Sequence, residues 1–171
     1  MLKKFIPKSY QQNVFKINYD KLKTNGIKLL IFDLDNTLSL IDEATPSLEI
    51  KKLINHLSKD FQILIASNNK EQRVKLFCQE LNCDYIYSSC KPTKKISRFV
   101  KKKYNLKNKQ IAIIGDQLVT DIFLGNRSHM YPILVDPKGE KDLKITSINR
   151  FIETKIKKKI DFKKGVYYEE N

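Results

Sequence analysis

Short apolar runs alternate with amphipathic segments along most of this chain. The first run, 27–32, is short and rich in branched apolar residues, which is typical of a parallel strand covered on both faces. Between the runs, apolar residues recur at spacings of three and four, which indicates helices. We therefore predict an α/β protein with a parallel sheet of about five strands between helical layers, joined by right-handed crossovers. The predicted strands are 27–32, 61–66, 84–88, 111–114 and 131–135.

Local signals mark where the helices begin. Thr45 followed by proline predicts an N-cap with proline in the first helical turn. Asn69 with Gln72 three residues later resembles a capping box, and Thr93 is the expected cap of the next helix. Apolar spacing then predicts one further helix over 118–126 and a C-terminal helix. The expected core-facing residues of that last helix are Ile145, Ile148, Ile152 and Ile156.

The 171 residues fit one domain that is large enough to bury a core. We divide it into an N-terminal basic and apolar segment (1–25), a catalytic core (26–140) and a C-terminal helix with a basic tail (141–171). No run of about 18 apolar residues occurs, so no transmembrane segment is expected. The first residues lack a sustained apolar stretch and a small-residue cleavage site, so no secretory signal is expected. Three cysteines without a Cys-x-x-Cys pair indicate free thiols in a reducing compartment.

The chain carries a formal net charge of +14, which comes mostly from lysine. Such a surface attracts nucleic acid, anionic lipid and phosphorylated substrates, although a Lys-, Asn- and Ile-rich chain can also reflect genome bias. No RNP-like aromatic motif, zinc knuckle or arginine-rich segment is present, so no specific nucleic-acid partner is expected. Apolar residues among lysines in 2–17 are compatible with docking on a membrane surface or with packing on the domain. Residues 155–164 are rich in lysine, which would favour binding to anionic lipid headgroups.

Polar side chains follow four of the predicted strands. The first strand ends in Asp-x-Asp and the second in Ser-Asn, the third is soon followed by Lys-Pro, and the fourth ends in Gly-Asp. Parallel strands place their carboxyl ends at one edge of a sheet, so these groups are expected to converge on one crevice. Neighbouring carboxylates repel unless a cation compensates, which indicates a hard metal ion. The alternative for the first motif is a polar turn that closes a strand. The residues concerned are Asp33, Asp35, Ser67, Asn68, Lys91, Asp116 and Asp121.

The expected crevice combines carboxylates with a hydroxyl, an amide and an ammonium. This set of groups suits phosphoryl transfer through an aspartyl-phosphate. A carboxylate can attack phosphorus, Mg²⁺ can bridge nucleophile and phosphate, and lysine and hydroxyl donors can neutralise the equatorial oxygens. The order Asp-x-Asp-x-Thr, Ser-Asn, Lys-Pro and Gly-Asp-x-x-x-x-Asp strongly resembles the haloacid dehalogenase (HAD) superfamily of phosphatases. The resemblance implies a three-layer Rossmann-like HAD fold and a Mg²⁺-dependent phosphomonoesterase.

The resemblance also implies a role for each motif residue. Asp33 would be the nucleophile, Asp35 the general acid and base, and Lys91 the group that stabilises the phospho-aspartate. The phosphate-binding positions would be Leu34 (through its backbone), Thr37, Ser67, Asn68 and Lys91. The Mg²⁺ ligands would be Asp33, Asp35 (through its main-chain carbonyl), Asp116 and, in support, Asp121. Simpler interpretations exist: Asp121 as a solvent-facing helix residue, Asn68 as part of a turn, and Lys91 as one lysine of many.

The spacing of the motifs leaves no room for a cap domain. One helix fills most of the chain between Asp35 and Ser67, and one helix with a short strand fills 67–91. The catalytic mouth is therefore expected to be open. An open site suits substrates too large to enclose, such as proteins, nucleic acids or lipids at a surface, whereas a closing lid would shield a small metabolite from water.

Pieces outside catalysis resemble the YqeG-like subfamily of this superfamily, among them 5–7, 73–77, 117–120 and 125–127. Related eukaryotic members are phosphatidylglycerophosphate phosphatases. The resemblance thus implies a lipid phosphatase that acts on an anionic phospholipid, cytoplasmic and peripheral on the inner face of the membrane. Residues 39–43 depart from the pattern, because an aromatic residue such as tryptophan is expected there. Two alternatives stay open: a phosphatase of soluble phosphoesters or phosphoproteins, and an RNA- or ribosome-associated factor with a vestigial site.

Overall fold

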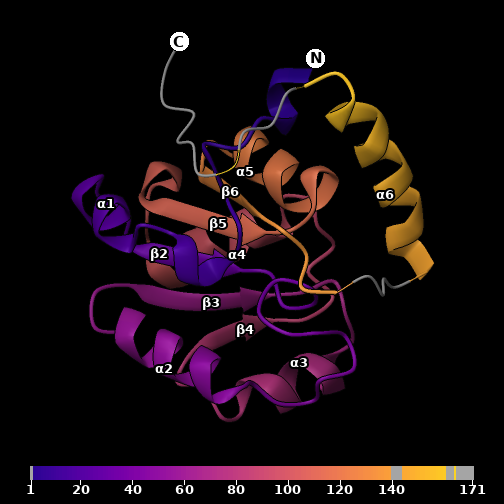
Figure 1. The fold of residues 1–171 in the computed structure, drawn as a ribbon. Helices are drawn as coiled ribbons and strands as arrows, with labels where there is room; N and C mark the ends of the chain where they lie inside the picture. Colours follow the sequence, from indigo (N-terminus) through magenta and orange to yellow (C-terminus); the bar gives the residue numbers. More distant parts are fainter. Residues whose placement is uncertain (1, 140–143, 161–163, 165–171) are drawn as a thin grey trace.

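The computed structural model describes residues 2–139, 144–160 and 164, which form a parallel sheet flanked by helices (Figure 1). The strand order is β1-β6-β5-β2-β3-β4, and every neighbouring pair is parallel. The predicted α/β class with a parallel sheet is confirmed, with six strands rather than about five. The strands are β1 (Ser9–Gln11), β2 (Leu29–Phe32), β3 (Gln62–Ala66), β4 (Asp84–Ile86), β5 (Ile111–Gly115) and β6 (Tyr131–Val135).

Strand β1 is the strand that the apolar pattern does not predict. It has the sequence Ser-Tyr-Gln and pairs with β6, with Ser9 opposite Ile133. All three of its residues are buried. Two of its polar side chains satisfy each other, because Gln11 Nε2 donates to Ser9 Oγ at 2.9 Å. A strand this short, with buried polar side chains, has no hydrophobic period that a sequence pattern could reveal.

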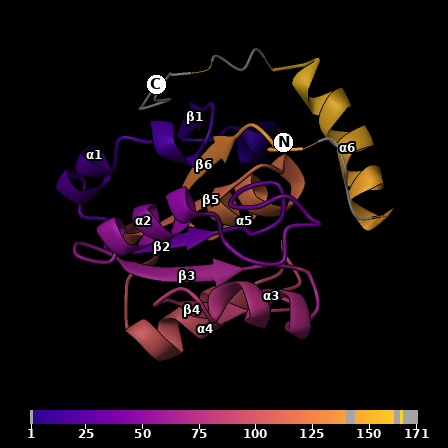
Figure 2. The ribbon, with the colours of Figure 1, turned by 60° about the horizontal axis from the view of Figure 1, so that its bottom comes forward.

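Alternate residues of the central strands supply two cores, one on each face of the sheet. Leu30 and Phe32 of β2 belong to the core with α1 (Tyr19–Thr24), α2 (Leu48–Leu57) and α3 (Glu71–Cys78). Leu29 and Ile31 belong to the core with α4 (Lys95–Tyr104) and α5 (Phe123–Arg127). Figure 2 shows the arrowheads of β2 and β3 pointing the same way, so the loops that follow these strands gather at one edge. The result is the three-layer Rossmann-like arrangement that was predicted.

The three predicted helix caps are each displaced. Helix α2 begins after Ser47, whose hydroxyl accepts a main-chain N–H, rather than after Thr45. Asn69 does not cap α3, because its side-chain oxygen accepts the N–H of the adjacent Lys70 at 2.8 Å, while its amide group donates to Asp35 at 3.1 Å. The cap position of α4 is Lys94, one residue after Thr93, although the Thr93 hydroxyl does accept the Lys95 N–H at 3.4 Å. The helices exist as predicted, but turn and site contacts set their first residues.

Helix α6 (Lys144–Lys157) lies along one flank of the molecule, beside η4 (Leu118–Ile122) (Figure 1). The segment η4 is a π-helix that continues into α5, where a single helix was predicted. Ile156 is buried against η4 as expected, but Ile152 is 42% exposed and Glu153 is buried instead. The predicted orientation is therefore wrong at Ile152, since α6 contacts a flank through a narrow strip rather than covering a sheet face. Ile145 and Ile148 lie outside the described side chains.

The start of the chain is anchored to the domain. Phe5, in the short helix η1 (Leu2–Phe5), stacks on Phe123 with ring centroids 5.3 Å apart. Asn126 Nδ2 donates to the main-chain oxygens of Lys4 and Ile6 at 2.9 and 2.8 Å. Two of the YqeG-like pieces, 5–7 and 125–127, therefore lie side by side, which gives a structural reason for residues that catalysis does not need.

The apolar residues that follow mostly pack on the domain as well. Val14, in η2 (Val14–Lys16), and Ile17 are buried, whereas Leu2 and Phe15 are exposed. Packing on the domain thus describes most of this segment, and two exposed apolar side chains are left at the surface. Within the described ranges, no helix has both the length and the apolar character needed to cross a bilayer. All three cysteines are free thiols.

Candidate active site

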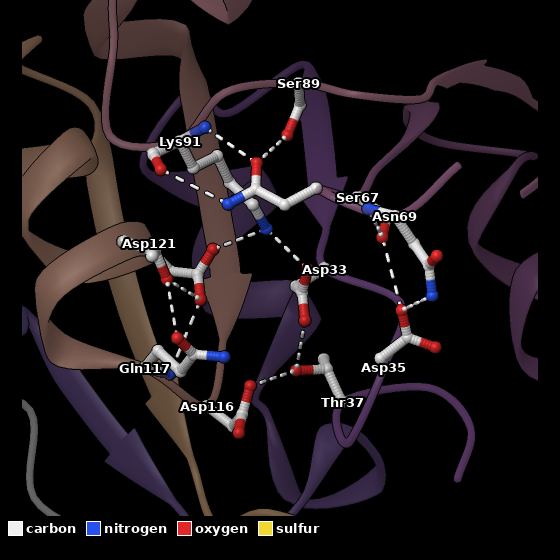
Figure 3. Close-up of polar contacts among 12 residues, drawn as sticks. Asp33, Asp35, Thr37, Ser67, Asn69, Ser89, Lys91, Asp116, Gln117 and Asp121 are labelled. Carbon is white, nitrogen blue, oxygen red and sulfur yellow. Dashed lines mark hydrogen bonds and ion pairs between the residues drawn. The ribbon is translucent and has the colours of Figure 1, made fainter. Parts of the chain in front are cut away.

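Four ionisable side chains from separate parts of the chain meet at the carboxyl edge of the sheet (Figure 3). Asp33 follows β2, and its N–H extends the ladder by donating to the Ile114 oxygen at 2.8 Å. Asp116 follows β5, Asp121 lies in η4, and Lys91 follows β4. Ligand oxygens of the three aspartates all lie within 4.8 Å of one another. The structure therefore brings these predicted site residues together.

Lys91 lies between two of these carboxylates. Its Nζ forms one ion pair with Asp33 Oδ1 and another with Asp121 Oδ1 at 2.7 Å, and all three side chains are nearly inaccessible to solvent. Burial raises the pKa of Asp33 well above its ordinary value, and Asp121 and Asp116 raise it further, against the opposing effect of Lys91. Burial alone would lower the pKa of Lys91, but Asp121 and Asp33 together raise it. The lysine therefore stays an ammonium.

Asp121 is fixed by its own loop. The Gln117 N–H donates to Asp121 Oδ2 at 3.4 Å, and the Thr120 hydroxyl donates to the same oxygen at 3.1 Å. Gly115 permits the close approach, because a Cβ built there would lie 2.3 Å from Asp121 Cγ. Asp121 is fully buried, so its interpretation as a solvent-facing helix residue is wrong.

The turn after Asp33 brings a hydroxyl and main-chain amides to the same edge. Thr37 Oγ1 lies within hydrogen-bond distance of Asp116 Oδ1 at 3.3 Å and of Asp33 Oδ2 at 3.5 Å. The Leu34 side chain is buried in the core, and its main-chain oxygen accepts N–H groups of the turn. The N–H groups of Leu34 and Asp35 donate to no other described residue. They are thus available for the phosphate-binding role that the resemblance implies.

Asp35 faces a different part of the site. Its Oδ2 accepts from Ser67 Oγ at 3.3 Å and from Asn69 Nδ2 at 3.1 Å (Figure 3). Ser67 follows β3 and itself accepts the Asn69 N–H at 3.0 Å. The Asp35 carboxylate is therefore outside the group of three aspartates, which leaves its main-chain carbonyl as the candidate metal ligand.

Arg73 is a site residue to which the sequence assigned no role. Its Nη2 lies 3.2 Å from Asp35 Oδ1 and donates to the Leu40 oxygen at 3.2 Å, while Nη1 donates to the Ala44 oxygen at 3.4 Å. Its guanidinium lies over the Phe77 ring, 5.4 Å from the centroid. Arg73 therefore ties α3 to Asp35 and to the loop 39–44, which departs from the subfamily pattern. Its place among the YqeG-like pieces was the one sequence signal for it.

Asn68 holds the loop that carries Lys91. Its Oδ1 accepts the Lys91 N–H at 2.8 Å and the Ser89 hydroxyl at 2.7 Å, and its Nδ2 donates to the Lys91 oxygen at 3.2 Å. Arg127 adds a bond from α5, because its Nη1 donates to the Pro92 oxygen at 3.1 Å. These contacts fit the turn interpretation of Asn68 better than direct phosphate binding. No signal in the sequence pointed to Ser89, and the one signal for Arg127 was the YqeG-like piece 125–127.

The chemistry of the donor set fits a hard divalent cation. Asp33, Asp116 and Asp121 are all buried and present carboxylate oxygens to one small volume. Buried charges need compensation, and the single Lys91 ammonium would offset only part of the charge if all three carboxylates were ionised. Mg²⁺ is bound in proteins by oxygen ligands, with a few carboxylates and several waters. The three aspartates therefore form a candidate Mg²⁺ site.

The parallel three-layer sheet and the order of the site residues along the chain give the HAD-like fold that the motif resemblance implies. A HAD family enzyme from Bacteroides thetaiotaomicron, solved as a magnesium complex, superposes with a TM-score of 0.52. The two chains are 14% identical, and the match covers 71% of this chain and 98% of that one. At this identity the likeness supports the fold.

The chain belongs to the family described as mitochondrial PGP (phosphatidylglycerophosphate) phosphatase, whose model matches residues 2–137. The Bacillus subtilis (strain 168) protein named "Probable phosphatase YqeG" is 39% identical over 173 residues, which covers 99% of this chain and 100% of the relative. The chloroplastic/mitochondrial phosphatidylglycerophosphate phosphatase 1 of Arabidopsis thaliana is 24% identical over 146 residues. That match covers 78% of this chain and 42% of the plant protein. The subfamily resemblance and the predicted phosphoric monoester hydrolase are thereby confirmed.

Proposed function

We propose that this phosphatase removes the terminal phosphate of phosphatidylglycerophosphate, with Mg²⁺ and through an aspartyl-phosphate formed on Asp33. The observation that carries the proposal is the cluster of Asp33, Asp116 and Asp121 with the Lys91 ammonium at the carboxyl edge of the sheet. Family membership and the plant relative's name support the choice of this lipid among phosphomonoesters.

In the first step, an Asp33 oxygen attacks phosphorus. The new O–P bond forms as the bond from phosphorus to the glycerol oxygen breaks, and Asp35 gives its proton to that leaving oxygen. Asp35 is suited to this task because Ser67 and Asn69 hold its carboxyl apart from the three clustered aspartates. The Lys91 ammonium and the N–H groups of the turn stabilise the charge that develops on the phosphoryl oxygens.

In the second step, water attacks phosphorus and gives a proton to Asp35, and the bond between phosphorus and the Asp33 oxygen breaks. Inorganic phosphate leaves and both carboxyl groups return to their starting states. Lys91 already pairs with Asp33 and so stabilises the carboxylate as it is released. Mg²⁺, held by Asp33, Asp116, Asp121 and the Asp35 main-chain carbonyl, would neutralise negative charge on the phosphate when bound.

Two features support a substrate at a membrane surface: the described part of the chain has no domain inserted over the active site, and the N-terminal segment carries lysines. Only α2 lies between β2 and β3, and only α3 lies between β3 and β4, so the described chain has no inserted domain over the site. Leu2 and Phe15 are exposed apolar side chains in a segment that also carries lysines. Basic groups near an anionic leaflet gain about 1 kcal/mol each.

The test compares phosphate release from three substrates, with Mg²⁺ and after its removal by EDTA. These are phosphatidylglycerophosphate in phosphatidylcholine vesicles, p-nitrophenyl phosphate, and a phosphoserine peptide. We expect Mg²⁺-dependent release with the highest kcat/KM on the lipid. Asp33→Asn should abolish release with an unchanged circular dichroism spectrum, and an acid-quenched phosphoenzyme should be trapped in the wild type alone.

Asp20→Asn is the matched control, because it removes an exposed carboxylate from α1 and should leave turnover unchanged. Substantial turnover by Asp33→Asn would rule out the assigned nucleophile. An equal or higher kcat/KM on the soluble esters would instead favour a phosphatase of soluble substrates.

A further inference from the structure

A cavity of about 310 Å³ opens at the carboxyl ends of β1 and β6, on the same edge of the sheet as the catalytic aspartates. Gln12 and Asn13, which follow β1, form one wall, and Lys138, shortly after β6, forms another. The cavity is large enough for a small organic group, since ligand pockets in proteins begin at roughly 300 Å³. No step of the proposed mechanism uses it.

The cavity adjoins the reacting centre through Thr37. This residue lines the cavity, and its hydroxyl lies 3.3 Å from Asp116 Oδ1. The Lys138 N–H donates to the Asn36 oxygen at 2.8 Å, and Lys138 Nζ donates to the Leu38 oxygen at 3.2 Å. The turn that carries the nucleophile is therefore in direct contact with the cavity wall, so a group bound there lies next to a phosphate placed at Asp33.

The lining combines apolar, amide and cationic groups. Val14 and Ile50 are buried and contribute apolar surface, whereas Gln12 and Asn13 contribute side-chain amides. Lys138 contributes an ammonium.

That ammonium is only weakly compensated, because Lys138 is the smallest of the causes that lower the pKa of the exposed Glu49 carboxylate on α2. Asp136 also lines the cavity, but its carboxylate is occupied by the Tyr10 hydroxyl at 2.5 Å and by Lys164 Nζ at 2.6 Å. Lys138, in contrast, forms a salt bridge with none of the described carboxylates. An anionic group next to it would gain a charge-assisted hydrogen bond.

We propose that this cavity binds the alcohol portion of the substrate and that Lys138 pairs with a second anionic group on that portion, a phosphodiester. The inference rests on the proposed function, in which Asp33 attacks the terminal phosphate. The substrate class is thus a phosphomonoester of a polyol that also carries a phosphodiester. Phosphatidylglycerophosphate has this chemistry, since a glycerol joins its two phosphates.

Soluble substrates test the cavity separately from the membrane. We compare kcat/KM for glycerophosphoglycerol phosphate, the deacylated headgroup, with kcat/KM for glycerol 3-phosphate, which lacks the diester. The wild type should prefer the headgroup by about tenfold or more, the range expected for a hydrogen bond to a charged group. Lys138→Gln should lose that preference, mainly through a higher KM for the headgroup. Lys28→Gln, an exposed lysine before β2 at the opposite edge, should change neither.

A second variant and a binding measurement test the cavity independently of Lys138 turnover. Gln12→Trp, at an exposed position, fills the cavity mouth and should also remove the preference. Glycerophosphoglycerol, which has no scissile phosphate, should shift NMR resonances of the wild type and bind at least about tenfold more weakly to Lys138→Gln.

Equal wild-type kcat/KM on the two soluble esters, or equal binding of glycerophosphoglycerol by wild type and Lys138→Gln, would overturn the inference. Asp33-independent turnover would overturn the proposed function instead. A higher kcat/KM on the lipid in vesicles than on the deacylated headgroup would show that the membrane adds to recognition by the cavity.

Discussion

Lys91 and Asp121 form an ion pair of 2.7 Å between side chains that are only 3% and 1% exposed. The lysine comes from the loop after β4 and the aspartate from the π-helix η4, so the pair joins two loops that follow different strands. Two charges at this depth are stable only together, because each alone would lose its hydration without a counterion. Because Lys91 also contacts Asp33, the pair fixes the ammonium at the nucleophile.

Lys91→Met should therefore lower both stability and activity. It leaves three buried carboxylates without their cation, and breaking a buried pair from one side typically costs about 3–5 kcal/mol. Loss of the positive charge at the phosphoryl site should lower kcat by about 100-fold or more. Urea unfolding and phosphate release measure the two effects. Lys91→Arg keeps the charge and should fold, and Lys28→Met controls for removing a lysine. A Lys91→Met protein with wild-type kcat would contradict the assigned role.

Gly115→Ala should act through Asp121 alone. The added Cβ would lie 2.3 Å from Asp121 Cγ, which is too close for any real contact, so the carboxylate must move away from Lys91. We expect kcat to fall at least about tenfold and unfolding free energy to fall by about 1–3 kcal/mol, the range for overpacking. A double-mutant cycle with Asp121→Ala measures the coupling between the two sites. If Gly115→Ala were equally destabilising with and without Asp121, the clash would not be the cause.

The convergence of the site was predictable because it depends only on strand direction. Asp33, Ser67, Lys91 and Asp116 follow parallel strands, and parallel strands deliver their carboxyl ends to one edge. Their roles came from the order of the motifs, which is a resemblance and not a consequence of spacing. The burial of Asp121 was not predictable, since it depends on a π-helix and on the missing Cβ at Gly115.

Other features left no local pattern in the sequence. Strand β1 is polar and short, and its burial depends on β6, which lies more than a hundred residues later in the chain. Glu153 is buried where a stripe of isoleucines predicted Ile152, because α6 meets a flank and not a sheet face. Arg73 reaches Asp35 across the fold, and no spacing rule connects an α3 side chain to that carboxylate.

Arg73 should prove to be a positioning residue for Asp35. The guanidinium spans Asp35, Leu40 and Ala44 at once, which the single ammonium of lysine cannot do. Arg73→Lys should therefore lower kcat by about tenfold, with a smaller change in KM, because the proton-transferring group is misplaced while the phosphate contacts stay intact. Steady-state kinetics on p-nitrophenyl phosphate separate kcat from KM. Arg98→Lys, an exposed arginine on α4, is the control. A matching loss in both variants would mean that Arg73 has no specific function at the site.

Asp84 should give the fold a measurable dependence on acid. Partial burial raises the pKa of Asp84, but hydrogen bonds from Lys103 and Tyr104 on α4 outweigh this and hold it below its ordinary value. The folded pKa is thus below the unfolded one, so the ionised carboxylate stabilises the fold at neutral pH, and this stability is lost as pH falls through the folded pKa. Asp84→Asn should destabilise by no more than about 1 kcal/mol at pH 7, because the pair is partly exposed. Urea unfolding at pH 7, 5 and 3 should show the gap between wild type and variant narrowing toward pH 3. Tyr104→Phe in the same series should shrink the gap, whereas a gap independent of pH would show that ionisation of Asp84 is not its source.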